Sequence, residues 1–167
     1  MNILGIAGWS GSGKTSLIVR LVPALNRIGQ TVSTLKHAHH EFDLDHKGKD
    51  SYRHREAGAY EVVVSSSSRW ALMHELRGED EPEMDELIAR MSPVDVLLVE
   101  GFKHHGHPKL EIHRPSVGKS LLQPDDPHIV AVASDAELPG LSVPVLDLAD
   151  ADAIAHFVVE YFRRRAA

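Results

Sequence analysis

A glycine-rich loop near the N-terminus carries the residues of this sequence best suited to chemistry. Residues 8–15 read Gly-Trp-Ser-Gly-Ser-Gly-Lys-Thr, which has the spacing of a Walker A loop. Glycines let backbone N–H groups curl around phosphate oxygens, the lysine reaches the β- and γ-phosphates, and the threonine hydroxyl ligates Mg²⁺. The nucleotide-binding residues expected here are Gly8, Ser10, Gly11, Ser12, Gly13, Lys14, Thr15 and Ser16, with Lys14 also catalytic and Thr15 also a metal ligand.

A Walker A loop also needs an acidic residue near Mg²⁺, and Glu100 is the candidate. It ends the apolar run 94–99, which is typical of a strand buried on both faces. Ligands of open α/β sheets bind at the carboxyl ends of the strands, so Glu100 is expected at the metal and Asp95 at the opposite edge. The alternative for Glu100 is a surface carboxylate at a strand end.

Asp43 and Asp45 are a further acidic pair, placed after a predicted second strand. We expect that strand to lie near the first, where these acids could hold a metal-bound water or align the attacking water. We therefore include both as catalytic candidates. A solvated pair in a polar loop is the alternative interpretation, and the residues leave the choice open.

Histidines and basic residues are dense between positions 36 and 55, where five of the twelve histidines lie. Anion binding needs no special geometry and is the interpretation we favour, ahead of exposed surface histidines and of Zn²⁺ or Ni²⁺ ligation. Metal ligation needs three or four converging ligands, and the chain has no cysteine. The residues that we assign to an anionic ligand are Lys36, His37, His39, His40, Lys49, Arg53 and Lys103.

The base of the nucleotide is the hardest feature to predict. A strand at 129–133 is followed by Ser134 and Asp135. An aspartate there could accept hydrogen bonds from guanine N1–H and N2–H₂, or it could serve as a helix N-cap or turn residue. The residues alone indicate a purine nucleoside triphosphate with a modest preference for guanine.

The elements that must position these residues alternate as in an α/β fold. We expect a P-loop NTPase fold with three layers, α/β/α, a mostly parallel sheet and antiparallel outer strands. Strands are predicted at 3–7, 31–35, 60–65, 69–74, 94–99, 110–113, 129–133 and 143–146, with 110–113 as an outer strand. Helices are predicted at 14–28, at 84–91, from 50 or 51 to about 58, and at the C-terminal end.

The length of 167 residues predicts one domain spanning 1–167. The net charge of −6 argues against broad nucleic-acid binding. No apolar run is long enough to span a membrane, and the first strand follows Met1 without a charged and apolar leader. We therefore expect a cytoplasmic protein.

Several motifs together resemble the family of molybdopterin-guanine dinucleotide biosynthesis protein B (MobB). They are Ala-Gly-Trp-Ser-Gly-Ser-Gly-Lys-Thr at 7–15, Lys-His-Ala-His-His at 36–40, Phe-Asp-Leu-Asp at 42–45, Gly-Lys-Asp-Ser-Tyr at 48–52, Arg-Glu-Ala-Gly-Ala at 55–59, Arg-Trp-Ala-Leu-Met at 69–73, Leu-Val-Glu-Gly-Phe-Lys at 98–103 and Ile-Val-Ala-Val-Ala-Ser-Asp at 129–135. The resemblance covers nearly the whole chain. One departure is Lys47, where the family usually has proline.

This resemblance implies a P-loop protein that binds GTP with Mg²⁺ and hydrolyses it weakly. It also implies a homodimer that assists the MobA guanylyltransferase in attaching GMP to the molybdenum cofactor, with molybdopterin or its guanylylated form as a second ligand. The family's phosphate loop carries over to residues 8–15, its acidic strand end to Glu100, and its histidine-basic block to residues 36–40 and 49–55. It also favours Ser134 and Asp135 as base-reading residues.

Two other functions fit the same loop. A small-molecule kinase would normally carry a lid with several arginines, whereas the candidate lid at 116–127 has Lys119 and no arginine. A nickel or cobalt metallochaperone GTPase would suit the histidines, but it would normally use cysteine, which this chain lacks.

Overall fold

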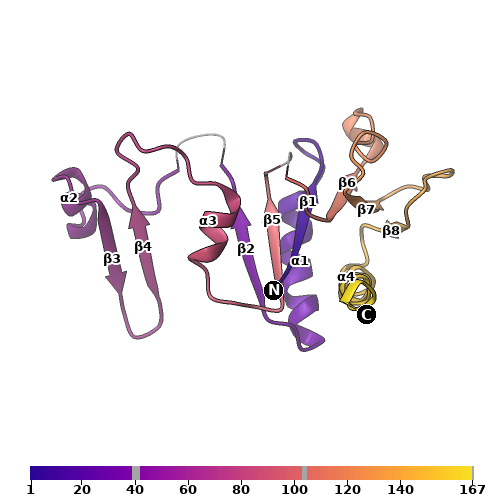
Figure 1. Ribbon diagram of the computed structural model, residues 1–167. Helices are drawn as coiled ribbons and strands as arrows, with labels where there is room; N and C mark the ends of the chain where they lie inside the picture. Colours follow the sequence, from indigo (N-terminus) through magenta and orange to yellow (C-terminus); the bar gives the residue numbers. More distant parts are fainter. Residues whose placement is uncertain (39–41, 103–104, 167) are drawn as a thin grey trace. The chain divides into compact units, whose positions relative to one another are not determined.

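A computed structural model describes residues 1–38, 42–102 and 105–166 (Figure 1). The chain forms two compact units, one made of Met1–His37 with Ser92–Ala167 and the other of Ala38–Met91. The sequence predicts a single domain, and the two units are described separately below. The first unit contains the Walker A loop and the second contains the acidic pair at 43 and 45.

The first unit is built on a six-stranded sheet in which all neighbouring strands are parallel. Its strands are β1 (Asn2–Ala7), β2 (Val32–Lys36), β5 (Val96–Glu100), β6 (Lys109–His113), β7 (Ile129–Ser134) and β8 (Val145–Asp147). Their order is β2-β5-β1-β6-β7-β8. The predicted α/β class with a parallel sheet is thus confirmed.

Two long helices of this unit, α1 (Lys14–Arg27) and α4 (Ala151–Ala166), pack against each other over one face of the sheet. The apolar core lies between these helices and alternate residues of the central strands. Its strand members are Leu4, Ile6, Val96, Leu98, Leu110, Ile112, Ala131 and Ala133, and its helix members include Leu17, Leu21, Leu25, Ile154 and Val158. In the described ranges, no helix is both long and apolar enough to cross a membrane.

Strand β6 is not the outer strand that its alternating sequence predicts. It lies inside the sheet between β1 and β7, and all five of its residues are buried. Its polar side chains are covered by the loop that follows the short 3₁₀ helix at Pro115–Val117. Lys109 Nζ pairs with Asp126 Oδ2 at 2.8 Å, and Glu111 accepts hydrogen bonds from the N–H groups of Leu122 and Gln123 at 2.8 Å. Residues of a later loop thus provide partners for Lys109 and Glu111, whose place in an alternating polar and apolar pattern predicts exposure to solvent.

Strand β2 lies near β1, as predicted, with β5 between the two. β2 pairs with β5 from Val32 opposite Val96 to Lys36 opposite Glu100. Strand β5, which ends at Glu100, is therefore the direct neighbour of β1, the strand that leads into the Walker A loop.

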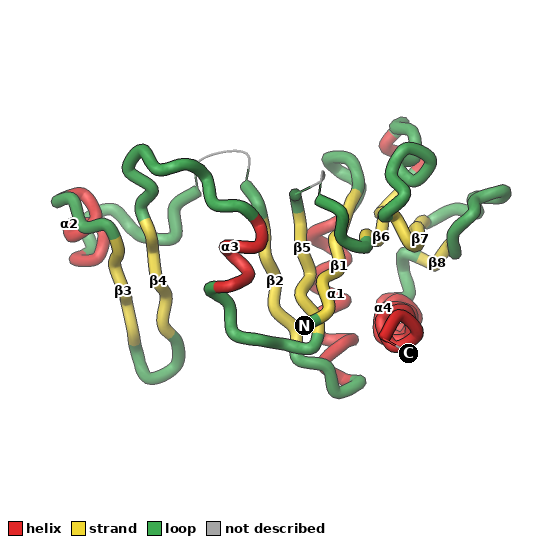
Figure 2. Tube along the Cα trace, in the orientation of Figure 1, coloured by secondary structure: helices red, strands yellow, loops and turns green. Residues whose placement is uncertain are grey.

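The second unit consists of α2 (Asp50–Glu56), β3 (Glu61–Ser65), β4 (Trp70–His74) and α3 (Met84–Ala89), shown by element type in Figure 2. β3 and β4 form the predicted antiparallel hairpin as a separate two-stranded sheet, and not at the edge of the parallel sheet. Val63 faces Leu72, and Ser65 faces Trp70 across the pair. On this face Val63, Leu72 and Trp70 are 63%, 43% and 70% exposed.

Candidate nucleotide-binding site

The Walker A loop joins β1 to α1 in the strand–loop–helix order that the sequence predicts. Gly8 has a φ of +141°, and a Cβ there would lie 2.6 Å from the carbonyl oxygen of Ile112 and 2.7 Å from Ser12 Oγ. Gly13 occupies the N-cap of α1 with a φ of +98°. The loop therefore needs glycine at both ends, and its last turn opens into a helix N-terminus that favours anions.

The side chain of Lys14 folds back over the start of this loop. Its Nζ donates hydrogen bonds to the carbonyl oxygens of Gly8 at 2.9 Å and Trp9 at 3.1 Å. The N–H of Ser12 donates to the same Trp9 oxygen at 3.1 Å. The ammonium group thus lies within the curve of the loop, where a phosphate-binding lysine is needed. Phosphate contact by Lys14 and the rest of the loop stays a prediction.

Glu100 lies at the edge of the sheet from which the loop emerges. In the register of β1 and β5 it faces Ile6, two residues before Gly8. Its carboxylate and the hydroxyl of Thr15 are hard oxygen donors of the kind that Mg²⁺ prefers. The donor chemistry therefore fits the predicted metal, whose ligation by Glu100 and Thr15 remains a prediction.

Asp95 lies at the opposite end of β5, as predicted, and has a structural role there. Its Oδ2 accepts hydrogen bonds from the N–H of Thr31 at 2.8 Å and from the Thr31 hydroxyl at 2.6 Å. These two bonds lower the pKa of the Asp95 carboxyl below its ordinary value. Asp95 therefore fastens the start of β5 to the start of β2, away from the loop.

The predicted base-reading residues lie at the end of β7, two strands away from β1: Ser134 is the last residue of the strand and Asp135 follows it. Ser134 is buried, and its Oγ accepts a hydrogen bond from the N–H of Ala136 at 3.2 Å. The Asp135 side chain, in contrast, is 45% exposed, and its Oδ2 lies 3.8 Å from Arg114 Nε. No helix begins after Asp135 in this described segment, so the N-cap alternative is wrong. Guanine recognition by this pair remains a prediction.

The segment considered above as a kinase-type lid is anchored to the Walker A loop. The indole Nε1 of Trp9 donates to the carbonyl oxygen of Ser120 at 2.8 Å, and Lys119 Nζ lies 5.7 Å from the Trp9 ring centre. Buried Glu111 holds the next residues of the same segment. No local sequence pattern marks these anchors, because their partners are separated by up to 111 positions.

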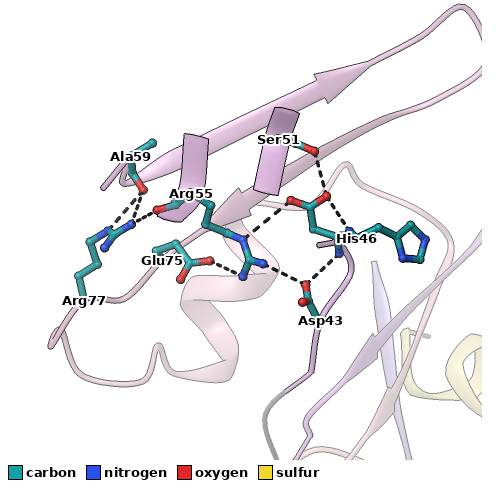
Figure 3. A network of polar contacts seen from close by, with 8 residues as sticks. Asp43, His46, Ser51, Arg55, Ala59, Glu75 and Arg77 are labelled. Carbon is teal, nitrogen blue, oxygen red and sulfur yellow. Dashed lines mark hydrogen bonds and ion pairs between the residues drawn. The ribbon is translucent and has the colours of Figure 1, made fainter. Parts of the chain in front are cut away.

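The two catalytic candidates Asp43 and Asp45 belong to the second unit, where both face Arg55 of α2. Figure 3 shows Asp43 beside the Arg55 side chain. Asp43 Oδ1 lies 3.2 Å from Arg55 Nη2 and also accepts the N–H of Asp45 at 2.9 Å. Asp45 Oδ1 accepts hydrogen bonds from the N–H of His46 and from Ser51 Oγ, each at 2.9 Å. Both carboxylates therefore shape the turn before α2, and their catalytic role stays a prediction.

Arg55 itself is tied to the far side of the same unit. Its Nη1 lies 3.3 Å from Glu75 Oε1, and its carbonyl oxygen accepts a bond from Arg77 Nη2 (Figure 3). Arg77 Nη2 also donates to the carbonyl oxygen of Ala59 at 3.0 Å. The network thus joins the loop at 43–45, helix α2 and the segment after β4.

The residues assigned to an anionic ligand fall in both units. Lys36 ends β2, and His37 follows with its N–H bonded to the Glu100 carbonyl oxygen at 2.8 Å. In the second unit, Lys49 is the N-cap of α2 and Arg53 lies in the last turn of that helix. His39, His40 and Lys103 lie outside the described residues.

Close packing surrounds His37. A Cβ at Gly101 would lie 2.6 Å from His37 Cβ, and the His37 ring lies 5.0 Å from that of Phe102. Within the described ranges, no three His, Asp or Glu side chains are arranged to hold a metal ion. The predicted Mg²⁺ site is of another kind, since it would draw most of its ligands from phosphate and water.

Comparison with known proteins gives a consistent result. The profile of the family described as "Molybdopterin guanine dinucleotide synthesis protein B" matches residues 3–135. A molybdopterin-guanine dinucleotide biosynthesis adapter protein of Escherichia coli K12 is 43% identical, over 98% of this chain and 94% of its own. One of the same name from Haemophilus influenzae is 38% identical, over 93% and 86%.

Solved structures agree with the sequence relatives. The crystal structure of a MobB protein homolog from Bacillus stearothermophilus covers 98% of this chain and 99% of its own, with a TM-score of 0.71 and 27% identity. A crystal structure of molybdopterin-guanine biosynthesis protein B covers 95% and 99%, with a TM-score of 0.73 and 26% identity.

Proposed function

The chain belongs to the MobB family, and we propose that it is a GTP-binding adapter protein in the biosynthesis of molybdopterin guanine dinucleotide. In this proposal the protein binds GTP with Mg²⁺, hydrolyses it slowly and assists a MobA-type guanylyltransferase. The names of the relatives support the adapter role, and the resemblance of the motifs supports GTP and the guanylyltransferase as partners.

The geometry of the Walker A loop is the observation that carries the nucleotide part of this proposal. The loop contains glycines with positive φ, and the ammonium group of Lys14 donates hydrogen bonds to the carbonyl oxygens of Gly8 and Trp9. On nucleotide binding, Lys14 would exchange these carbonyl contacts for phosphate oxygens. Glu100 in register with Ile6 would hold Mg²⁺ together with the Thr15 hydroxyl.

A second, anionic ligand would engage cations of the basic block within one of the two units. Lys36 and His37 lie at the same edge of the sheet as Glu100, and Lys49 and Arg53 are exposed cations of the second unit. Molybdopterin carries a terminal phosphate, which clustered cations bind in a salt-dependent way. This ligand would let one adapter hold both GTP and the pterin that receives GMP.

Calorimetric titration tests the proposal directly. The protein is titrated with GTP, ATP and molybdopterin, each with Mg²⁺, beside Lys14→Ala and the matched control Lys47→Ala, an exposed lysine of another loop. We expect Lys14→Ala to abolish binding of both triphosphates while the fold persists, and Lys47→Ala to bind normally. Unchanged GTP affinity in folded Lys14→Ala would contradict the proposal.

The titration with molybdopterin is repeated with a variant that lacks cations of the basic block. Replacement of Lys36, His37, Lys49 and Arg53 by glutamine should weaken molybdopterin binding, which should also weaken in the parent protein as salt rises. GTP affinity should be nearly unchanged. Tight Zn²⁺ or Ni²⁺ binding lost in this variant, with unchanged molybdopterin affinity, would favour a metallochaperone instead.

A further inference from the structure

Arg114 is a cation at the Walker A loop that lies outside the Walker motif. It follows β6 directly, and its guanidinium packs against the loop at the N-cap of α1. A Cβ at Gly13 would lie 3.5 Å from Arg114 Nε and 3.6 Å from its Nη2. These are ordinary contact distances, so the guanidinium lies directly beside the phosphate loop at Gly13.

Arg114 also reaches the residue proposed to read the base. Strands β6 and β7 are in register with His113 opposite Ser134, so Arg114 and Asp135 follow their strands at equivalent positions. Arg114 Nε lies 3.8 Å from Asp135 Oδ2, which is an ion pair longer than a hydrogen bond. Arg114 Nε is buried and has no hydrogen-bond partner among the described residues.

This arrangement suits a carboxylate that must stay available to a ligand. The contact restrains Asp135 through charge, while Arg114 Nε, at 3.8 Å, forms no hydrogen bond to the Asp135 carboxylate. The Asp135 side chain remains 45% exposed, so it can accept bonds from outside.

We infer that Arg114 is a positioning residue that sets the base specificity of the nucleotide site by holding Asp135 beside the phosphate loop. Held there, Asp135 accepts hydrogen bonds from guanine N1–H and N2–H₂, which adenine cannot supply in that pattern. The inference rests on the proposed GTP binding and adds to it the residue that couples the phosphate loop to base recognition.

The test separates base recognition from phosphate binding. Affinities for GTP, ITP, ATP and inorganic tripolyphosphate, each with Mg²⁺, are measured for the parent protein and for Arg114→Gln, Arg114→Lys, Asp135→Asn and the double variant Arg114→Gln/Asp135→Asn. ITP lacks the exocyclic amine of guanine, and tripolyphosphate lacks a base. Arg27→Gln is the matched control, since Arg27 also lies near a carboxylate, Asp152, but at the far end of α1.

We expect Arg114→Gln to reduce the GTP-to-ATP preference by about tenfold, the equivalent of about 1.4 kcal/mol, and to change tripolyphosphate affinity by less than about twofold. Arg114→Lys should retain part of the preference, because it keeps the charge. The double variant should lose no more preference than Asp135→Asn alone, since both act through one carboxylate. Arg27→Gln should behave as the parent protein does.

Other outcomes overturn the inference in distinguishable ways. An unchanged GTP-to-ATP ratio in Arg114→Gln, or additive losses in the double variant, would show that Arg114 does not act through Asp135. Equal weakening of all four ligands would make Arg114 a phosphate contact instead. A parent protein that binds tripolyphosphate and both triphosphates without preference would refute base specificity alone, whereas one that binds none of them would refute the proposed function as well.

Discussion

The imidazole of His107 packs directly against Gly5 of β1. A Cβ at Gly5 would lie 2.5 Å from His107 Nε2, so the missing side chain makes the space for the ring. His107 is 8% exposed, and both ring nitrogens are buried without a hydrogen-bond partner in the described part of the chain. A neutral imidazole tolerates this environment better than a charged one.

Burial is the main cause of a strongly lowered pKa for His107, at about 4. The positive charge of Lys109 lowers it further, as do His105 and His128, while Asp126 acts in the opposite direction. The unfolded chain would bind this proton near pH 6.5, and the folded protein near pH 4. The unfolded state therefore binds more protons between these values, and the stability associated with His107 is lost as pH falls through that window.

We predict that His107→Leu removes this part of the acid sensitivity. Each pKa unit corresponds to about 1.4 kcal/mol, so His107 should account for at most about 3 kcal/mol of the stability lost between pH 7 and pH 4. Urea unfolding of the parent protein and the variant at several pH values measures this difference. His156→Gln, on exposed α4 surface, is the control and should keep the parent slope. A variant with the parent slope would contradict the lowered pKa.

The close approach at Gly8 predicts a second measurable effect. Gly8→Ala places a Cβ 2.6 Å from a backbone oxygen at a φ of +141°, so strain and overpacking should cost about 3 kcal/mol or more. Gly140→Ala is the control, because Gly140 has a positive φ of +84° but open space around it. It should cost about 1 kcal/mol. Urea unfolding compares the two, and equal losses would show that the contact with Ile112 yields readily.

Carboxylate-to-amide substitutions at the two ends of β5 should affect different properties: nucleotide affinity at Glu100 and stability at Asp95. Glu100→Gln should lower Mg²⁺-dependent GTP affinity by about tenfold with little loss of stability, because the amide keeps the shape but loses the charge. Asp95→Asn should leave that affinity unchanged and cost about 1 kcal/mol of stability, because it weakens the two bonds from Thr31. Titration with and without Mg²⁺, together with urea unfolding, measures both. Equal effects on Mg²⁺ dependence would contradict the metal role of Glu100.

Much of the first unit is predictable because its signals are local. The apolar run before Gly8 and the apolar spacing after Lys14 predict the strand and the helix that hold the loop, and the run before Glu100 predicts β5. The order of the strands is not local information, and the sequence therefore does not predict that β5 lies between β2 and β1. Strand β6 was misplaced because its polar residues find partners in a later loop.

The candidate site shows the same division. The Walker spacing specifies which residues form the loop, and no comparable pattern marks Arg114. Its significance comes from the parallel register that places it level with Asp135 and next to Gly13. Asp43 shows the converse case, since an acid in a polar loop suggests catalysis, whereas its contacts with Arg55 also give it a structural role.

The hairpin of the second unit predicts self-association. A two-stranded hairpin is marginally stable alone, and the β3–β4 face with Val63, Leu72 and Trp70 is exposed. The MobB resemblance implies a homodimer, and we expect this face to contribute to it. Leu72→Glu should then increase the monomer fraction in sedimentation experiments, whereas Val19→Glu on exposed α1 should not. A parent protein that is monomeric at every concentration would contradict the prediction.

The turn at Asp45 gives a final prediction, which separates structure from catalysis. The Asp45 side chain is only 7% exposed, and its Oδ2 faces Arg55 Nε at 4.0 Å with no hydrogen bond between them. Asp45→Asn removes the charge that Arg55 faces and should cost about 1–3 kcal/mol of stability. Asp80→Asn, in an exposed loop of the same unit, is the control and should cost little.

The same Asp45→Asn protein also tests the catalytic hypothesis, if GTP turnover is measured well below its melting temperature. A structural role predicts a lower melting temperature with GTP turnover close to that of the parent, because the carboxylate is already engaged by Ser51 and the N–H of His46. A catalytic role predicts the reverse, with a loss of turnover in a protein that melts normally. We expect the first outcome for Asp45. Asp43 is more exposed, so Asp43→Asn should cost less stability, and its turnover is then the sharper test of catalysis.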